Sequence, residues 1–94
     1  MIRVRLFAAL RELAGSGEVL VSGRSVGEVV DAVLITISPD HKERFAQIAA
    51  VSSFVVNGER AALEAPVAGG DEVAILPPVS GGSGSTYTPP AGER

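Results

Sequence analysis

The stretch "RSVGEVVDAVLITIS" at residues 24–38 carries one apolar stripe, and the rest of the chain must build a surface to cover it. Ser25, with Glu28 three residues later, matches a capping box and predicts that a helix begins here. Apolar residues then recur at helical spacing along one face: Val26, Val29, Val30, Val33, Leu34 and Ile37. Because most of them are β-branched and lower helix propensity, tertiary packing has to sustain this helix.

Two strands are predicted before this helix. "MIRVRLFAAL" (1–10) alternates in polarity, which predicts a half-buried strand with Ile2, Val4 and Leu6 on one face and Arg3 and Arg5 on the other. "ALRELAGSG" (9–17) predicts a short helical turn, and "EVLVSG" (18–23) predicts a second strand. We expect these two strands to form an antiparallel hairpin with an unusually wide connection.

After the main helix, "SPDHKERFAQIAAV" (38–51) predicts a second helix, with Ser38 at its N-cap and Pro39 at its first position. "SSFVVNGERAAL" (52–63) predicts a hairpin around the tight turn Asn57-Gly58. The predicted order is therefore two strands, two helices, and then the hairpin, so strands flank the helical region on either side.

The last predicted strand is "DEVAILPP" (71–78), which Pro77-Pro78 ends because proline cannot continue a hydrogen-bonded ladder. The order of elements indicates an α+β fold. The first and last strands are the natural central pair, because both are apolar enough to be covered. A β-grasp, ubiquitin-like fold fits best, with a mixed four- to five-stranded sheet packed on one main helix.

The predicted sheet also has apolar residues on its other face. If Leu6, Val56, Val73 and Ile75 point toward the helix, four residues fall on the opposite side: Phe7, Val55, Ala74 and Leu76. Single exposed apolar residues are normal on a protein surface. Together, the four could form a patch that marks a protein–protein interface.

Charge and composition exclude several classes of partner. Eight basic residues against eleven acidic ones give a net charge of −3, and Arg3, Arg5 and Arg11 form no stripe that could follow phosphates, so nucleic acid is not expected. Cysteine is absent, which excludes disulfides and thiol chemistry. No secretory signal or segment of membrane-spanning length is visible, so we expect a cytoplasmic location and no membrane partner.

Side chains that could carry catalysis are scarce. No nucleophile elbow, phosphate loop or metal-binding pair is present. The lone His41 is interpreted as a solvated side chain, and Asp71 and Glu72 are adjacent in a strand, so they should point to opposite faces. Gly69-Gly70 is interpreted as a loop, because a strand follows it.

The remaining candidate is the C-terminal stretch "LPPVSGGSGSTYTPPAGER" (76–94). Two glycines at a chain end can thread a narrow tunnel, because they lack Cβ atoms and adopt backbone angles closed to other residues. The terminal carboxylate would then be the reactive group. On spacing alone, however, Gly81-Gly82 followed by Ser-Gly-Ser is typical of a linker.

Three segments together resemble a known family: "IRVRLFAALRELAG" (2–15), "FVVNGE" (54–59) and "GDEVAILPPVSGG" (70–82). They are similar to the small, sulfur-carrying subunit of molybdopterin synthase, of the MoaD/ThiS group of β-grasp carriers. The resemblance covers residues 2–82. It implies a carrier domain at 1–82 with a mobile arm at 77–82, followed by a disordered extension at 83–94. Related carriers for cysteine or thiamine synthesis remain alternatives.

The resemblance also implies a mechanism for a carrier that is not itself the catalyst. An E1-like enzyme would use Mg-ATP to adenylate the carboxylate of Gly82, next to Gly81, and sulfur transfer would make a thiocarboxylate. The large subunit of the synthase would use this sulfur on precursor Z. No cofactor would be bound by the carrier. Contacts with the partner are implied for Phe7 and Leu76 and for the arm residues Pro77, Pro78, Val79 and Ser80.

One feature departs from the family pattern. Gly82 is followed by Ser83, and an amide carbonyl cannot be adenylated. We therefore expect a protease to cut between Gly82 and Ser83 and remove residues 83–94. The alternatives are an added or non-functional extension, a plain β-grasp interaction module, and a protein modifier joined to lysines through Gly82.

Overall fold

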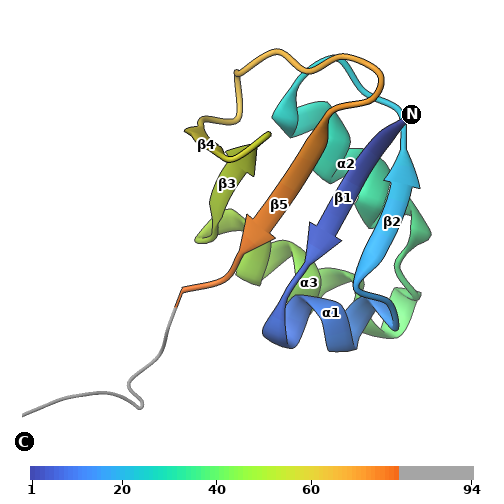
Figure 1. Ribbon diagram of the computed structural model, residues 1–94. Helices are drawn as coiled ribbons and strands as arrows, with labels where there is room; N and C mark the ends of the chain where they lie inside the picture. The colour runs from blue at the N-terminus through green and yellow to red at the C-terminus, as the bar shows by residue number, and fades with distance from the viewer. Residues whose placement is uncertain (79–94) are drawn as a thin grey trace, which may run out of the picture.

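The computed structural model describes residues 1–78, which form a five-stranded sheet and three helices (Figure 1). In chain order, the elements are β1 (Ile2–Leu6), α1 (Ala8–Ala14), β2 (Glu18–Val21), α2 (Val26–Thr36), α3 (Pro39–Ala50), β3 (Ser53–Val56), β4 (Glu59–Ala61) and β5 (Glu72–Leu76). The strand order in the sheet is β2-β1-β5-β3-β4. The neighbours β1 and β5 run parallel and the other pairs run antiparallel, so the sheet is mixed, as predicted.

The first and last strands are neighbours in the interior of the sheet, which confirms their predicted pairing. Val4 lies opposite Val73, and Leu6 lies opposite Ile75. The side chains of these four residues are almost completely buried, with relative exposures between 0% and 2%. Parallel strands covered in this way are typically rich in Val, Ile and Leu, which is the composition found here.

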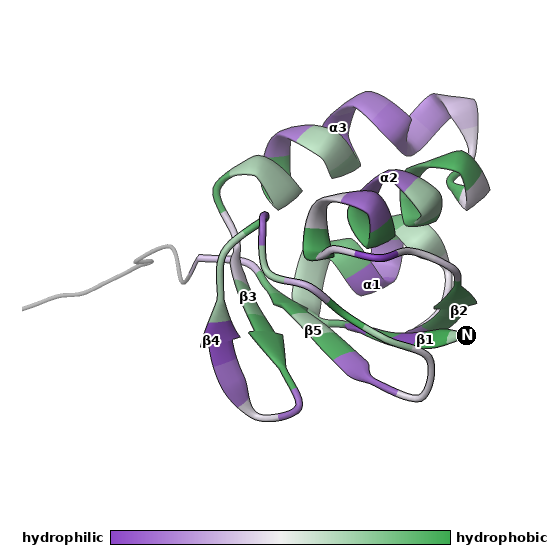
Figure 2. Cartoon of the chain, turned by 90° about the horizontal axis from the view of Figure 1, so that it is seen from above, coloured by the Kyte–Doolittle hydropathy of each residue, from purple (hydrophilic) through white to green (hydrophobic). Residues whose placement is uncertain are grey.

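The helices cover one face of the sheet, as Figure 2 shows from above. The apolar stripe of α2 faces the sheet, and four of its valines are buried: Val26, Val29, Val30 and Val33. Ser25 caps the helix, because its Oγ accepts a hydrogen bond from the backbone N–H of Glu28 at 3.2 Å. The Glu28 carboxylate reaches one residue further back than in a standard capping box, and accepts from the N–H of Arg24 at 2.9 Å.

Helix α3 contributes more to the core than the prediction of one main helix allowed. Phe45 is fully buried, and Ala49 is nearly so. Both lie on the same face of α3, one turn apart, and that face packs against the core together with α2. Pro39 begins the helix as predicted, but the side chain of Ser38 makes no capping hydrogen bond.

The β3–β4 hairpin turns at Asn57-Gly58, as predicted. Both residues have positive φ, +50° and +87°, which a two-residue turn of this type requires and which Asn and Gly tolerate. Asn57 also holds the start of β5: its Oδ1 accepts from the N–H of Glu72 at 3.0 Å, and its Nδ2 donates to Asp71 at 3.1 Å. The turn and the last strand are therefore fixed to each other.

Candidate functional site

The parallel register of β1 and β5 brings the C-terminal ends of both strands to the same end of the sheet. Leu6 and Ile75 are the last register partners, so Phe7 and Leu76 follow at the same end. The chain leaves the sheet here through Pro77-Pro78 (Figure 1). Pro77 is half-buried and Pro78 is exposed, so the chain points away from the core at the last residue that the structure describes.

Phe7 lies on the outer face, the face of the sheet that the helices leave uncovered. Its relative exposure is 37%, which is large for an aromatic residue in a small protein. The Arg5 guanidinium lies over the ring, 5.7 Å from its centroid, and also pairs with the Glu72 carboxylate at 3.4 Å. Arg5 thereby joins the exposed ring to β5 across the sheet.

The residue after Phe7 has an unusual backbone. Ala8 has φ +53°, in the left-handed region that residues with a Cβ seldom adopt. This conformation turns the chain directly from β1 into α1, so that Phe7 stays in extended backbone with φ −132°. Sequence reasoning missed this feature, because alanine gives no signal for positive φ.

The predicted outer-face residues lie on neighbouring strands and form a group that we call the outer patch: Phe7, Val55, Ala74 and Leu76. Val55 lies opposite Ala74, and Leu76 lies opposite Ser53. Val55, Ala74 and Leu76 are half-buried, while their neighbours Phe54, Val73 and Ile75 point into the core. The predicted assignment of faces is therefore confirmed.

Charged residues border the outer patch on the side of β2. Arg3 pairs with Glu18 at 2.9 Å, next to the pair formed by Arg5 and Glu72. These four charges balance, so this side of the outer face carries no net charge. Leu20 lies beyond them on β2 with an exposure of 60%, and register places it opposite Arg3. The alternation in β2 could have revealed this exposed leucine, but the prediction did not include it.

The titratable residues singled out in the sequence take structural roles. Asp71 accepts hydrogen bonds from the backbone N–H of Ala68 at 2.8 Å and from the side chain of Asn57. These two bonds, the one from Ala68 foremost, hold the pKa of Asp71 below its ordinary value. His41 is exposed, and its Nδ1 lies 3.2 Å from the carbonyl oxygen of Leu13, linking α3 to α1.

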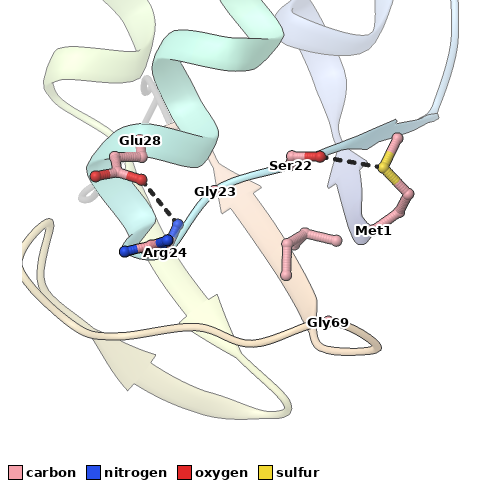
Figure 3. Close-up of a pocket in the computed structure, with 7 residues that line it drawn as sticks. Met1, Ser22, Gly23, Arg24, Glu28 and Gly69 are labelled. Atoms are coloured by element: carbon pink, nitrogen blue, oxygen red, sulfur yellow. Dashed lines mark hydrogen bonds between the residues drawn. The ribbon is translucent and has the colours of Figure 1, made fainter.

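A hollow with a volume of about 500 Å³ lies at the opposite end of the sheet (Figure 3). Met1, Ser22 and Gly69 line it, and the Ser22 hydroxyl donates to the Met1 sulfur at 3.3 Å. On the far side, Glu28 is occupied with the backbone of Arg24. The hollow lies where β1 and β5 begin, so it is not at the end of the sheet where β5 ends.

Within residues 1–78, no group of three or more His, Asp or Glu side chains is placed to hold a metal ion. None of the three helices described is long and apolar enough to cross a membrane. The predicted reactive and processing residues Gly81, Gly82 and Ser83, and the arm residues Val79 and Ser80, lie outside the described residues. The described part of the site is therefore a surface of β-strands with a buried underside, next to the point where the described chain ends.

Comparisons with known proteins agree with this arrangement. The model of the ThiS family matches residues 4–82. SAMP1 from Haloferax volcanii is 37% identical, with a TM-score of 0.68, and the match covers 85% of this chain and 97% of SAMP1. A chain of the BexX/CysO complex of Amycolatopsis orientalis is 27% identical, with a TM-score of 0.70, and the match covers 86% of this chain and 99% of the other.

A third structure is described as a putative molybdopterin converting factor, subunit 1, from Pyrococcus furiosus. It is 26% identical, with a TM-score of 0.62, and the match covers 83% of this chain and 97% of that one. No curated protein sequence was similar enough to count as a match. The matched proteins share the β-grasp fold. Because the family model covers most of the chain and SAMP1 is 37% identical, the chain belongs to the ThiS family and is a sulfur carrier or ubiquitin-like modifier of the ThiS/MoaD type.

Proposed function

We propose that this protein is the sulfur-carrier subunit of molybdopterin synthase and donates sulfur from a thiocarboxylate at Gly82 to precursor Z. One observation carries the proposal: the β1–β5 register places Phe7 and Leu76 beside the point where Pro77-Pro78 leads the chain out of the sheet. A partner that covers the outer patch would be positioned to receive the arm. The similarity to the converting-factor subunit of Pyrococcus furiosus supports this branch.

The proposed chemistry takes place on the main chain. The Gly82 carboxylate attacks the α-phosphate of Mg-ATP in an E1-like enzyme, and pyrophosphate leaves. Sulfide then attacks the acyl carbon, a C–S bond replaces the bond to AMP, and a thiocarboxylate is left as AMP departs. In the large subunit, sulfur passes to the precursor, and water restores the carboxylate. The carrier needs no nucleophilic side chain for this sequence, and the chain has no cysteine.

Processing is part of the proposal, because Gly82 carries a free carboxylate only after residues 83–94 have been removed. Intact-mass measurement of the protein from its native host tests this step. We expect a species that ends at Gly82. If the full 94-residue mass alone is found in cells with an active synthase, processing at Gly82–Ser83 is wrong. A cytoplasmic location for these steps remains a prediction.

The activity itself is tested with a chain that ends at Gly82. It is incubated with an activating enzyme, Mg-ATP and a sulfur source, and its mass is measured. We expect a gain equal to the replacement of one oxygen by one sulfur, and then product formation with the large subunit and precursor Z. The matched control is a chain that ends at Gly81, which keeps the described fold but shortens the arm by one residue. Equal sulfur loading of both chains would contradict the role of the second glycine.

A second candidate function is a protein modifier that forms an isopeptide bond through Gly82. The similarity to SAMP1, a small archaeal modifier protein, favours it, as the identity of 37% exceeds that to the converting-factor subunit. The similarity to the carrier of the BexX/CysO complex likewise keeps a cysteine-pathway carrier in view. The same activation assay separates the candidates: conjugates on lysines, with no sulfur gain, would indicate a modifier. Sulfur gain without transfer to precursor Z would indicate another carrier pathway.

A further inference from the structure

An apolar groove on the helical side of the molecule is not used by the proposed function. It has a volume of about 310 Å³ and lies between α2 and α3, and Phe54 of β3 and Leu63 also line it. Its α3 wall consists of the small residues Ala46, Ala49 and Ala50. The alanine side chains of this wall are short, and the opposite wall carries larger side chains of α2.

The groove is mostly apolar, with one carboxylate among the described residues that line it. Leu34 and Leu63 supply apolar surface that is partly exposed, and Leu63 keeps 49% of its surface accessible. Among residues 1–78, Asp31 is the single charged residue that lines the groove, and it is exposed. An aromatic ring with a hydroxyl group fits this combination, because the ring would cover the apolar wall and the hydroxyl would donate to the carboxylate.

The chain itself supplies such a group. Tyr87 is the single tyrosine of the sequence and lies in the extension beyond Gly82. The described part of the chain ends near the groove: Phe54, which lines the groove, lies opposite Ile75, and Ser53 lies opposite Leu76, so this part of the groove is one strand away from the end of β5. The stretch from Pro78 to Tyr87 can span up to about 30 Å when extended, so its length does not limit contact.

We propose that the groove between α2 and α3 binds Tyr87 of the same chain. Tethering gives the tyrosine an effective concentration on the order of millimolar, so that a weak contact is sufficient to populate the bound form. The docking does not depend on the proposed function.

The composition of the chain makes a direct measurement possible. With no Trp and one Tyr, the intrinsic fluorescence of the 94-residue protein comes from Tyr87. Acrylamide quenching is measured for the native chain and for Ala46→Arg, whose long side chain would fill the groove. The matched control is Ile35→Arg, which adds the same charge to α2 at a side chain that is 78% exposed and does not line the groove.

We expect the quenching slope of the native chain and of Ile35→Arg to be about twofold lower than that of Ala46→Arg. Leu34→Asp should match Ala46→Arg, and circular dichroism checks that each variant is folded. Chymotrypsin, which cleaves after tyrosine, should cut at Tyr87 faster in both groove variants. Equal slopes in all four proteins would overturn the proposal. Because no partner is present, this result would leave the sulfur-carrier proposal untouched, and a failed activation assay would leave the docking untouched.

Discussion

Leu6 and Ile75 are the last partners in the parallel ladder of β1 and β5, and they join the beginning of the chain to the last strand that the structure describes. Both are buried, and the next residue on each strand, Phe7 and Leu76, belongs to the outer patch. Core packing therefore fixes the position of the outer patch. A surface held in this way can serve as a docking platform without rearrangement.

Leu76→Glu should weaken binding to the partner subunit, because it places a charge in the outer patch beside the exit of the arm. We expect at least about a tenfold loss of affinity, the size found when a central interface residue is altered. Titration calorimetry with a chain ending at Gly82 measures it. Leu20→Glu is the matched control, as Leu20 is exposed on the outer face of β2 but separated from the outer patch by β1. If the two variants lose affinity equally, the outer patch is not the docking surface.

Phe45→Ala tests the contribution of α3 to the core. Removing this fully buried ring should lower the free energy of unfolding by about 3–5 kcal/mol, through lost burial and the cavity left behind. Urea unfolding followed by circular dichroism measures the change. Ile35→Ala on the exposed side of α2 should stay within about 0.5 kcal/mol. A cost below about 1 kcal/mol for Phe45→Ala would mean that α3 is not part of the core.

Ala8→Gly should stabilise the protein, because Ala8 has φ +53° and glycine adopts this conformation without the clash of a Cβ. We expect the free energy of unfolding to rise by up to about 1 kcal/mol, after the greater entropy of glycine in the unfolded chain is taken into account. Thermal unfolding measures it. The converse variant, Gly15→Ala, should lower stability by about 1 kcal/mol, since Gly15 ends α1 at φ +75° with open space around a Cβ. If both variants shift the free energy of unfolding in the same direction, the positive φ assigned to Ala8 and Gly15 is contradicted.

Asp71 predicts a pH dependence of stability. Its pKa in the folded protein lies below the ordinary value of 3.8, because the N–H of Ala68 and the amide of Asn57 donate to the ionised carboxylate. A lowered pKa means that the stabilisation is present above the unfolded value and is lost as the pH falls through the folded value. Asp71→Asn should therefore be less stable than the parent chain at neutral pH, and the difference between the two should shrink in acid. NMR titration of Asp71 measures the pKa, and a value above 3.8 would refute the assignment.

Much of the fold was predictable, because local patterns and the need for one covered face agreed. The stripe of α2 was visible in its spacing, the turn in Asn57-Gly58 and the end of β5 in Pro77-Pro78. Burial of Phe45 was not predicted, because α3 has a polar sequence around it, and periodicity does not show where a second helix packs. That depends on the space left by other elements.

The candidate site was predictable in its faces and less so in its details. Alternation placed Phe7 and Leu76 on the outer face, and the register brought them to the same end of the sheet. The left-handed backbone of Ala8 and the stacking of Arg5 on Phe7 arise from tertiary geometry that no motif encodes. The groove between α2 and α3 was missed for the same reason, as alanines carry no signal until two helices meet.

The parallel pairing of β1 and β5 also has a mechanical consequence. β1 begins at one end of the sheet and β5 leaves it at the other, so a pull on the C-terminal arm against the N-terminus loads the hydrogen bonds between them in shear. In shear, the bonds of the ladder bear the force together rather than opening one after another. β5 is also held by β3 on its other side. A partner could therefore bind the arm, and release it, without unfolding the domain that carries it.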